Sequence, residues 1–260
     1  MKLTVLTENY AGGRFLAEYG LSYLIEIGGK RILFDTGHSD VFLKNAALLG
    51  IDIQSEIKTV VLSHGHWDHG DGLVHLHGQT LICHPDCFMK RYRKMNSTYL
   101  GLNQTEAELC ERFNLITSKE PIEVIPNLFY LGEIPRTFDF EAQTTVFLTE
   151  DGQPDFIPDD SALVAVDGDE IVVITGCSHS GICNIVQYAM QVTGIEKVRA
   201  VVGGLHLKKK DANTAKTIEY LKNLGVEKVL PSHCTELPAM TAFYDAFGSV
   251  PLKTGMVVEL

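Results

Sequence analysis

The sequence has no excess of positive charge. Its 22 Lys and Arg residues are outnumbered by 33 Asp and Glu residues, which gives a formal net charge of −11 at pH 7. Proteins that bind nucleic acid along its backbone need the opposite sign, because much of their affinity comes from Lys and Arg contacts with phosphates. The composition therefore argues against a nucleic-acid partner.

Long apolar runs and paired cysteines are also missing. An apolar run such as IVVIT at 171–175 is far shorter than the roughly 20 residues that span a bilayer, so no membrane partner is expected. The first residues, MKLTVLTENY, contain no apolar core of a secretory signal, which favours a cytoplasmic location. The 6 cysteines form no paired framework and are expected to be thiols in that reducing compartment.

Proline is scarce, with 9 among 260 residues, and no stretch rich in Pro, Gly or Ser divides the chain. Hydrophobic residues make up 45% and charged residues 21%, which is typical of a globular protein that needs no disulfide. Each half of the chain shows strand-like hairpins first and strand–helix units later. We predict a single α/β domain over residues 1–260, built from two similar halves, with an insertion at about 86–122.

The densest cluster of potential metal ligands is SHGHWDHGDG at 63–72, directly after an apolar strand. It contains His64, His66, Asp68 and His69. Imidazole and carboxylate together suit Zn²⁺, Fe²⁺ or Mn²⁺ better than Ca²⁺ or Mg²⁺, which prefer oxygen ligands. Alternate residues of an extended segment point to the same side, so the first two histidines can bind one ion while the other two side chains turn to another.

Three later runs of strand-forming residues each end in a histidine, namely His179, His206 and His233. In layered α/β proteins the ligand site lies beyond the carboxyl ends of the strands, so these side chains are expected to converge. A buried imidazole bonded to a backbone carbonyl explains any one of them equally well, but it explains all three poorly. Asp35, at a further strand end, is expected to accept the N–H of a ligating imidazole.

Four other residues are weaker candidates. Cys177 ends its strand two residues before His179, and its thiolate is a good zinc ligand. Asp160 is either a carboxylate ligand or part of a turn. Arg91, in the insertion, and Arg136 offer positive charge to an anionic substrate, although a solvated surface explains Arg91 equally well.

These motifs carry a family resemblance. SHGHWDHGDG resembles the H-x-H-x-D-H signature of the metallo-β-lactamase fold superfamily, and the order FDTG, this motif, TGCSHSGI, GGLHL and PSHCT resembles one branch of it. That branch comprises metal-dependent hydrolases, or 7,8-dihydropterin-6-yl-methyl-4-(ribofuranosyl)aminobenzene-phosphate synthase-like proteins. The resemblance covers nearly the whole chain. It implies an α/β (α+β) fold, an αββα four-layer sandwich of two mixed β-sheets flanked by helices, with a dinuclear site at one edge of the sheets.

The resemblance also implies two divalent metal ions, with zinc favoured and iron or manganese as alternatives. The expected ligands of the two ions are, in order, His64 with His66, and Asp68 with His69 and His233. The superfamily usually adds a histidine to the first ion, for which we choose His179, and a bridging aspartate. This chain has Cys177 where that aspartate is expected, so Cys177 and Asp160 are the alternative ligands.

The expected function is hydrolysis of a small anionic ester, phosphodiester or lactone-like substrate by metal-activated water. Asp68 would orient the water, and His206 would donate a proton to the leaving group or contact its phosphate. The alternatives are a pterin-linked synthase using the same site and a non-catalytic metal-binding or ligand-sensing module. A nuclease is disfavoured by the negative charge, and a redox di-iron protein usually has a glutamate where this chain has His66.

Overall fold

The computed structural model describes residues 1–260, and the contacts within it divide the chain into two compact units. Unit 1 comprises residues 1–119, 144–159 and 253–259. Unit 2 comprises residues 120–143 and 160–252, with Leu260. The single domain expected from the sequence stays a prediction. No helix in the structure combines the length and the apolar character needed to cross a membrane.

Unit 1 is organised around a seven-stranded sheet in the order β16-β1-β2-β3-β4-β5-β7. In that order the strands are Val257–Glu259, Lys2–Thr7, Ser22–Ile27, Lys30–Phe34, Thr59–Val61, Thr80–Cys83 and Asn114–Thr117. The strands from β16 to β3 are antiparallel to their neighbours, whereas β3, β4, β5 and β7 are parallel. The Gly28-Gly29 turn joins β2 to β3, so the hairpin expected there is confirmed.

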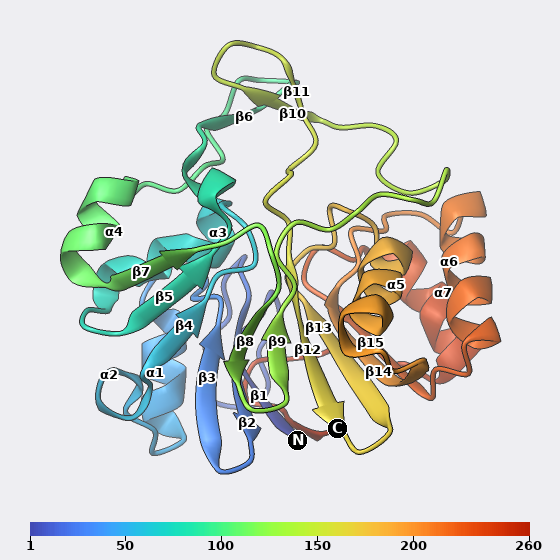
Figure 1. The fold of residues 1–260 in the computed structure, drawn as a ribbon, viewed down its shortest axis with the longest axis horizontal. Coiled ribbons are helices and arrows are strands. Elements are labelled where there is room, and N and C mark those ends of the chain that lie inside the picture. The colour runs from blue at the N-terminus through green and yellow to red at the C-terminus, as the bar shows by residue number, and fades with distance from the viewer. The chain divides into compact units, whose positions relative to one another are not determined.

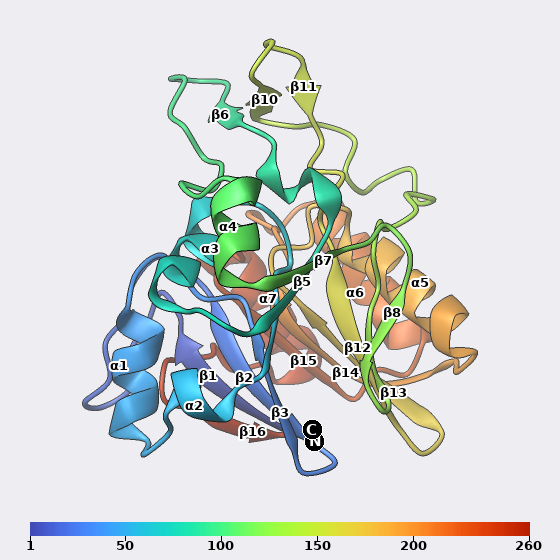
Figure 2. The same ribbon diagram turned by 60° about the vertical axis from the view of Figure 1, so that its left-hand side comes forward.

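The helices of unit 1 pack against this sheet (Figure 2). They are α1 (Val41–Leu48), α2 (Ile53–Glu56), α3 (Trp67–Gly70), α4 (Glu106–Arg112) and the 3-10 helices η1 (Asp71–His75) and η2 (Pro85–Phe88). Phe42 of α1, Ile53 of α2 and Leu109 of α4 share one buried cluster with Leu24 and Val60 of the strands. Burial of this shared apolar surface holds the helices to the sheet.

The segment predicted as an insertion divides between two sheets of unit 1. Its early part forms β6 (Arg91–Arg93), which pairs with β10 (Phe147–Thr149) and, through it, with β11 (Pro154–Asp155). Its late part forms β7, which is the edge strand of the seven-stranded sheet beside β5. The small three-stranded sheet was not expected from the sequence, because its strands are two or three residues long and lie far apart in the chain.

Unit 2 has a six-stranded sheet in the order β15-β14-β13-β12-β9-β8 (Figure 1). In that order the strands are Lys228–Ser232, Lys197–Gly204, Glu170–Thr175, Ala162–Asp167, Leu128–Tyr130 and Ile122–Ile125. The three helices are α5 (Ile182–Thr193), α6 (Ala212–Asn223) and α7 (Leu237–Phe247). They follow β13, β14 and β15 in turn, as the strand–helix pattern of the sequence predicts.

Parallel pairing brings the carboxyl ends of β13, β14 and β15 to one edge of this sheet. Thr175 is the register partner of Gly203, and Gly203 is the partner of Pro231. Ile185 of α5 and Phe243 of α7 belong to the buried cluster that joins the helices to the strands. The loops that leave the three strand ends carry the histidines singled out in the sequence.

Arg91 lies at the start of β6 and is completely buried. Its Nε donates to Asp155 Oδ2 at 2.8 Å and its Nη1 donates to Asp159 Oδ2 at 3.0 Å. The expectation that Arg91 contacts an anionic substrate is therefore corrected, because its guanidinium is buried and already bonded to two carboxylates of unit 1. Asp159 in turn accepts from Gly65 N at 2.7 Å, so this ion pair supports the histidine-rich loop.

Arg91→Met is expected to lower the free energy of unfolding by about 3–5 kcal/mol, because it leaves two buried carboxylates without their cation. Urea unfolding of the full chain measures this difference. Arg93→Met, on the exposed end of the same strand, is the matched control and should change stability by less than about 0.5 kcal/mol. Equal effects of the two variants would contradict the structural role of Arg91.

Candidate metal centre

The loop after β4 and the helix α3 that follows it bring three imidazoles and one carboxylate of unit 1 together. His64 Nε2 lies 2.9 Å from His66 Nδ1, and the ring centroids of His64 and His69 are 4.2 Å apart. Asp68 Oδ2 lies 3.9 Å from His69 Nε2. All four side chains are buried. Unit 1 therefore brings together the four donors that the sequence motif predicts.

Asp35 fixes the orientation of His69. Its Oδ2 lies 2.7 Å from His69 Nδ1 and accepts from Ser63 Oγ at 2.7 Å, while its Oδ1 accepts from Ser63 N at 2.7 Å. A carboxylate at Nδ1 selects the tautomer that leaves Nε2 as the lone-pair donor. Asp35 also has a left-handed backbone with φ of 56°, a conformation that costs free energy and clusters at functional sites.

Gly65 lets this loop pass close to the neighbouring chain. A Cβ at this position would lie 1.9 Å from the carbonyl oxygen of Cys87 and 2.8 Å from Nη1 of Arg91. No side chain fits in that space. The glycine between His64 and His66 is therefore needed for the two imidazoles to take their observed positions.

Unit 2 presents a second group of donors at the ends of β13, β14 and β15. The ring centroids of His179 and His206 are 4.4 Å apart. His206 and His233 both have φ of 48°, and Ser178, beside His179, has φ of 57°. Non-glycine residues with a positive φ are uncommon. Three of them at adjacent strand ends indicate that the surrounding fold imposes the backbone geometry of this group.

Cys234 lies among these donors, directly after His233. Burial raises the pKa of its thiol, but hydrogen bonds with Cys177 and His206 and the nearby charge of His206 and His233 outweigh burial and hold this pKa well below its usual range. Sequence reasoning missed Cys234, because a single cysteine beside a predicted ligand gives no signal of its own.

Asp160 is completely buried in unit 2. Its Oδ2 accepts from Ser180 N at 2.8 Å and from Ser180 Oγ at 2.7 Å. Burial raises the pKa of Asp160 to about 6, although Ser180, His179 and the charge of Arg136 oppose the change. Asp160 therefore ties the loop after β13 to the start of β12.

Arg136 is half-buried, and its positive charge lowers the pKa of Asp160. A contact between Arg136 and a substrate stays a prediction.

The donors of unit 1 fit a metal ion by their chemistry and spacing. Three imidazoles and one carboxylate form the kind of mixed nitrogen and oxygen set that binds zinc, iron or manganese. One ligand atom of His69 lies within 4.8 Å of one of His64. The buried carboxylate behind His69 supplies the supporting hydrogen bond that metal-ligating histidines usually have.

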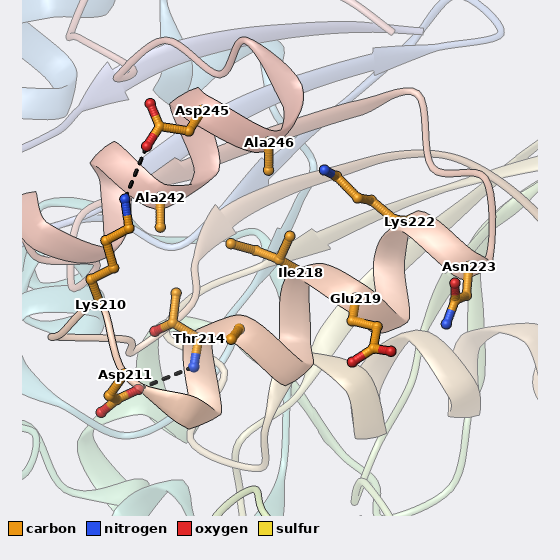
Figure 3. A pocket seen from close by; sticks show the side chains of 11 residues that line it. Lys210, Asp211, Thr214, Ile218, Glu219, Lys222, Asn223, Ala242, Asp245 and Ala246 are labelled. Atoms are coloured by element: carbon orange, nitrogen blue, oxygen red, sulfur yellow. Dashed lines mark hydrogen bonds and ion pairs between the residues drawn. The ribbon is translucent and has the colours of Figure 1, made fainter.

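A cavity of about 460 Å³ lies between α6 and α7 of unit 2 (Figure 3). Within it Lys210 Nζ donates to Asp245 Oδ2 at 3.0 Å, and Asp211 Oδ1 accepts from Thr214 N at 3.1 Å. None of its lining residues is a histidine or a cysteine, and none is a predicted site residue. The cavity is therefore separate from the candidate metal ligands.

Comparisons with known proteins show which family this chain is similar to. The family model described as the metallo-β-lactamase superfamily matches residues 17–83. The chain is 35% identical over 270 residues to the 7,8-dihydropterin-6-methyl-4-(β-D-ribofuranosyl)-aminobenzene-5′-phosphate synthase of Methanocaldococcus jannaschii, covering 95% of this chain and 92% of that protein. An uncharacterized protein of the same organism is 33% identical over 248 residues, covering 92% of each chain. A solved metal-dependent hydrolase of the β-lactamase superfamily is 32% identical, with a TM-score of 0.88 and coverage of 100% of this chain and 99% of that chain.

The chain belongs to the metallo-β-lactamase superfamily. The resemblance and the fold class inferred from the sequence are confirmed, with three sheets and seven α-helices in a mixed α/β arrangement. Members of this superfamily typically bind metal ions, and histidine, cysteine and aspartate residues of this chain form groups able to hold them. A named enzyme among the relatives supports an enzymatic role.

Asp35→Asn is expected to weaken divalent metal binding by about 10–100-fold, because an amide cannot accept both from His69 and from Ser63 as the carboxylate does. Competition with a chromophoric chelator measures the affinity. Asp71→Asn is the matched control, since Asp71 is also buried in unit 1 but accepts from Asn103 N at 2.9 Å. Unchanged affinity in the Asp35 variant would contradict a supporting role.

The free energy of unfolding of the metal-free protein should depend on pH because Asp160 titrates. Its folded pKa of about 6 lies above the unfolded value of 3.8, so its contribution to stability is present at low pH and is lost as pH rises through about 6. That change corresponds to about 3 kcal/mol. Asp160→Asn removes the titration, so its free energy of unfolding should rise relative to wild type between about pH 4 and about pH 7. A constant difference across that range would contradict the raised pKa.

Proposed function

We propose that the protein is a metal-dependent hydrolase of a small anionic ester, phosphodiester or lactone-like substrate. The observation that carries this proposal is the cluster of His64, His66 and His69 with its supporting carboxylate Asp35. The atoms that would bind metal are buried and held in place before any ion arrives, which lowers the cost of ordering them on binding.

The proposed centre contains two ions, with zinc favoured and iron or manganese as alternatives. The ligands are assigned as in the superfamily: His64 and His66 with His179 for the first ion, and Asp68 and His69 with His233 for the second. Cys177 and Asp160 stay the alternatives to His179. Oδ2 of Asp160 accepts two hydrogen bonds from Ser180, and its buried Oδ1 accepts none. The spacing of the donors within unit 1 and their strand-end positions in unit 2 support this assignment.

The ions would lower the pKa of a bound water and polarise the carbonyl or phosphoryl group under attack. The residues of the chain prepare the site for that chemistry. Asp68 supplies a carboxylate beside His69 and would orient the attacking water. Asp35 keeps the His69 ring from rotating, and Ser63 holds the Asp35 carboxylate in place. The buried position of these groups excludes bulk water, which strengthens the electrostatic interactions within the site.

A second candidate function is favoured by one comparison. The relative that is 35% identical is named a synthase of 7,8-dihydropterin-6-methyl-4-(β-D-ribofuranosyl)-aminobenzene-5′-phosphate. A pterin-linked synthase would use the same donors to bind an anionic substrate. Such a synthase would join the amine nitrogen of the ribofuranosyl-aminobenzene phosphate to the methylene carbon of a dihydropterin, as that carbon loses an anionic leaving group and the nitrogen loses a proton. Formation of the compound from these two substrates, without hydrolysis of simple esters, would favour this function over the hydrolase.

Replacement of the predicted ligands tests the proposal. His64→Asn and His66→Asn should each lower bound metal and reduce hydrolysis of bis(4-nitrophenyl) phosphate or 4-nitrophenyl acetate by at least about 100-fold. Removal of metal with a chelator should abolish turnover, and added Zn²⁺, Mn²⁺ or Fe²⁺ should restore it. His75→Asn, at an exposed histidine of the same unit, is the matched control.

Two results would contradict the proposal. The first is full activity after metal removal. The second is metal binding that is unchanged in the His64 and His66 variants, since these histidines carry the assignment. A protein that binds metal tightly but converts none of the ester, phosphodiester, lactone or pterin substrates would instead be a metal-binding or sensing module.

A further inference from the structure

Unit 2 contains a compact set of two thiols and one imidazole. Cys177 follows β13, His206 follows β14 and Cys234 follows β15, so the three residues come from three adjacent parallel strands. One ligand atom from each, the two Sγ atoms and a ring nitrogen, lie within 4.8 Å of one another. Ligands around a tetrahedral zinc ion have comparable separations, because zinc–sulfur bonds are about 2.3 Å and zinc–nitrogen bonds about 2.0–2.1 Å.

The backbone around the two thiols is built for their close approach. The thiol of Cys234 donates to the carbonyl oxygen of Cys177 at 3.4 Å, and His206 N donates to Cys234 Sγ at 3.3 Å. A Cβ on Gly204 would lie 2.6 Å from Cys234 Sγ and 3.3 Å from the Cα of Cys177. A glycine at the end of β14 is therefore required for the thiols to occupy this place.

These two thiols differ from the other buried cysteines. Cys183 belongs to the apolar cluster between helices and sheet in unit 2, and Cys83 and Cys87 belong to the corresponding cluster in unit 1. Cys177 and Cys234 are buried but belong to neither cluster, and they lie beside polar histidines at the strand ends. Packing in the hydrophobic core explains the burial of the first three cysteines and does not explain the burial of the last two.

We propose that Cys177, Cys234 and His206 form a metal site that takes one thiolate-binding divalent ion, with Zn²⁺ as the expected occupant. Unit 2 alone supplies the three ligands of this site, and the proposal does not depend on the proposed hydrolysis. Binding converts the two thiols to thiolates and releases their protons to solvent. Three protein ligands leave the fourth position of a tetrahedral ion to water or a substrate atom. His206 then acts as a ligand, in place of the proton donor expected from the sequence.

Cobalt substitution tests this site directly. The full-length protein is stripped of metal, kept reduced and anaerobic, and titrated with Co²⁺. Wild type should develop a thiolate-to-cobalt charge-transfer band in the near ultraviolet that saturates at one ion per chain. Cys177→Ser and Cys234→Ser should each weaken this binding by about tenfold or more and remove most of the band, and His206→Ala should weaken it similarly.

Two controls separate this site from the others. Cys183→Ser replaces a buried thiol of the same unit and should leave the band intact. His64→Asn should lower the total cobalt bound while keeping the part of the band that Cys234→Ser removes, so failure of the unit 1 site is distinguishable from failure of this one. Absence of the band in wild type, or its persistence in Cys234→Ser, would overturn the proposal.

A measurement on the wild-type protein tests the site without any variant, so it still applies if a serine variant does not fold. X-ray absorption at the zinc edge of the zinc-loaded protein should show sulfur neighbours at about 2.3 Å beside nitrogen and oxygen neighbours. A first shell containing only nitrogen and oxygen would overturn the proposal.

Discussion

The hydrogen bonds of the Asp35 carboxylate are the constraint on which the candidate site depends. This side chain is completely buried at the end of β3, and its two oxygens bind His69 and both polar groups of Ser63. A buried carboxylate without such partners would cost several kcal/mol. These hydrogen bonds offset the cost of burying the carboxylate. They also hold Ser63 and His69, at the start and the end of the histidine-rich segment, so the same bonds contribute to the stability of the fold and to the geometry of the ligands.

Support for that loop extends beyond the residues that face the candidate site. Arg91 and Asp159 form a buried ion pair beneath it, and Asp159 holds the backbone N–H of Gly65. In unit 2 the corresponding constraint is conformational, since His206 and His233 are held in left-handed backbone geometry at adjacent strand ends. In both units, therefore, buried charge or strained backbone next to the donors costs free energy of folding. The packing of the surrounding sheets compensates for that cost.

Much of this arrangement could be predicted from the sequence because it depends on local patterns. Alternation and glycine turns locate the hairpins, and the strand–helix repeats place His179, His206 and His233 at the ends of parallel strands. Asp35 was predictable because it ends a strand near the motif. The partners of Arg91, by contrast, lie 64 and 68 residues away, and Cys234 lies 57 residues from Cys177. Such pairings depend on tertiary packing, which no local spacing reports.

The central claim is that His64, His66 and His69 bind metal in the geometry that Asp35 fixes. Anomalous diffraction at the zinc, iron and manganese edges from crystals of the wild-type protein tests it most directly. The account predicts an anomalous peak about 2.0–2.2 Å from imidazole nitrogens of this loop. Crystals grown with these metals that show no peak at the three histidines would contradict it.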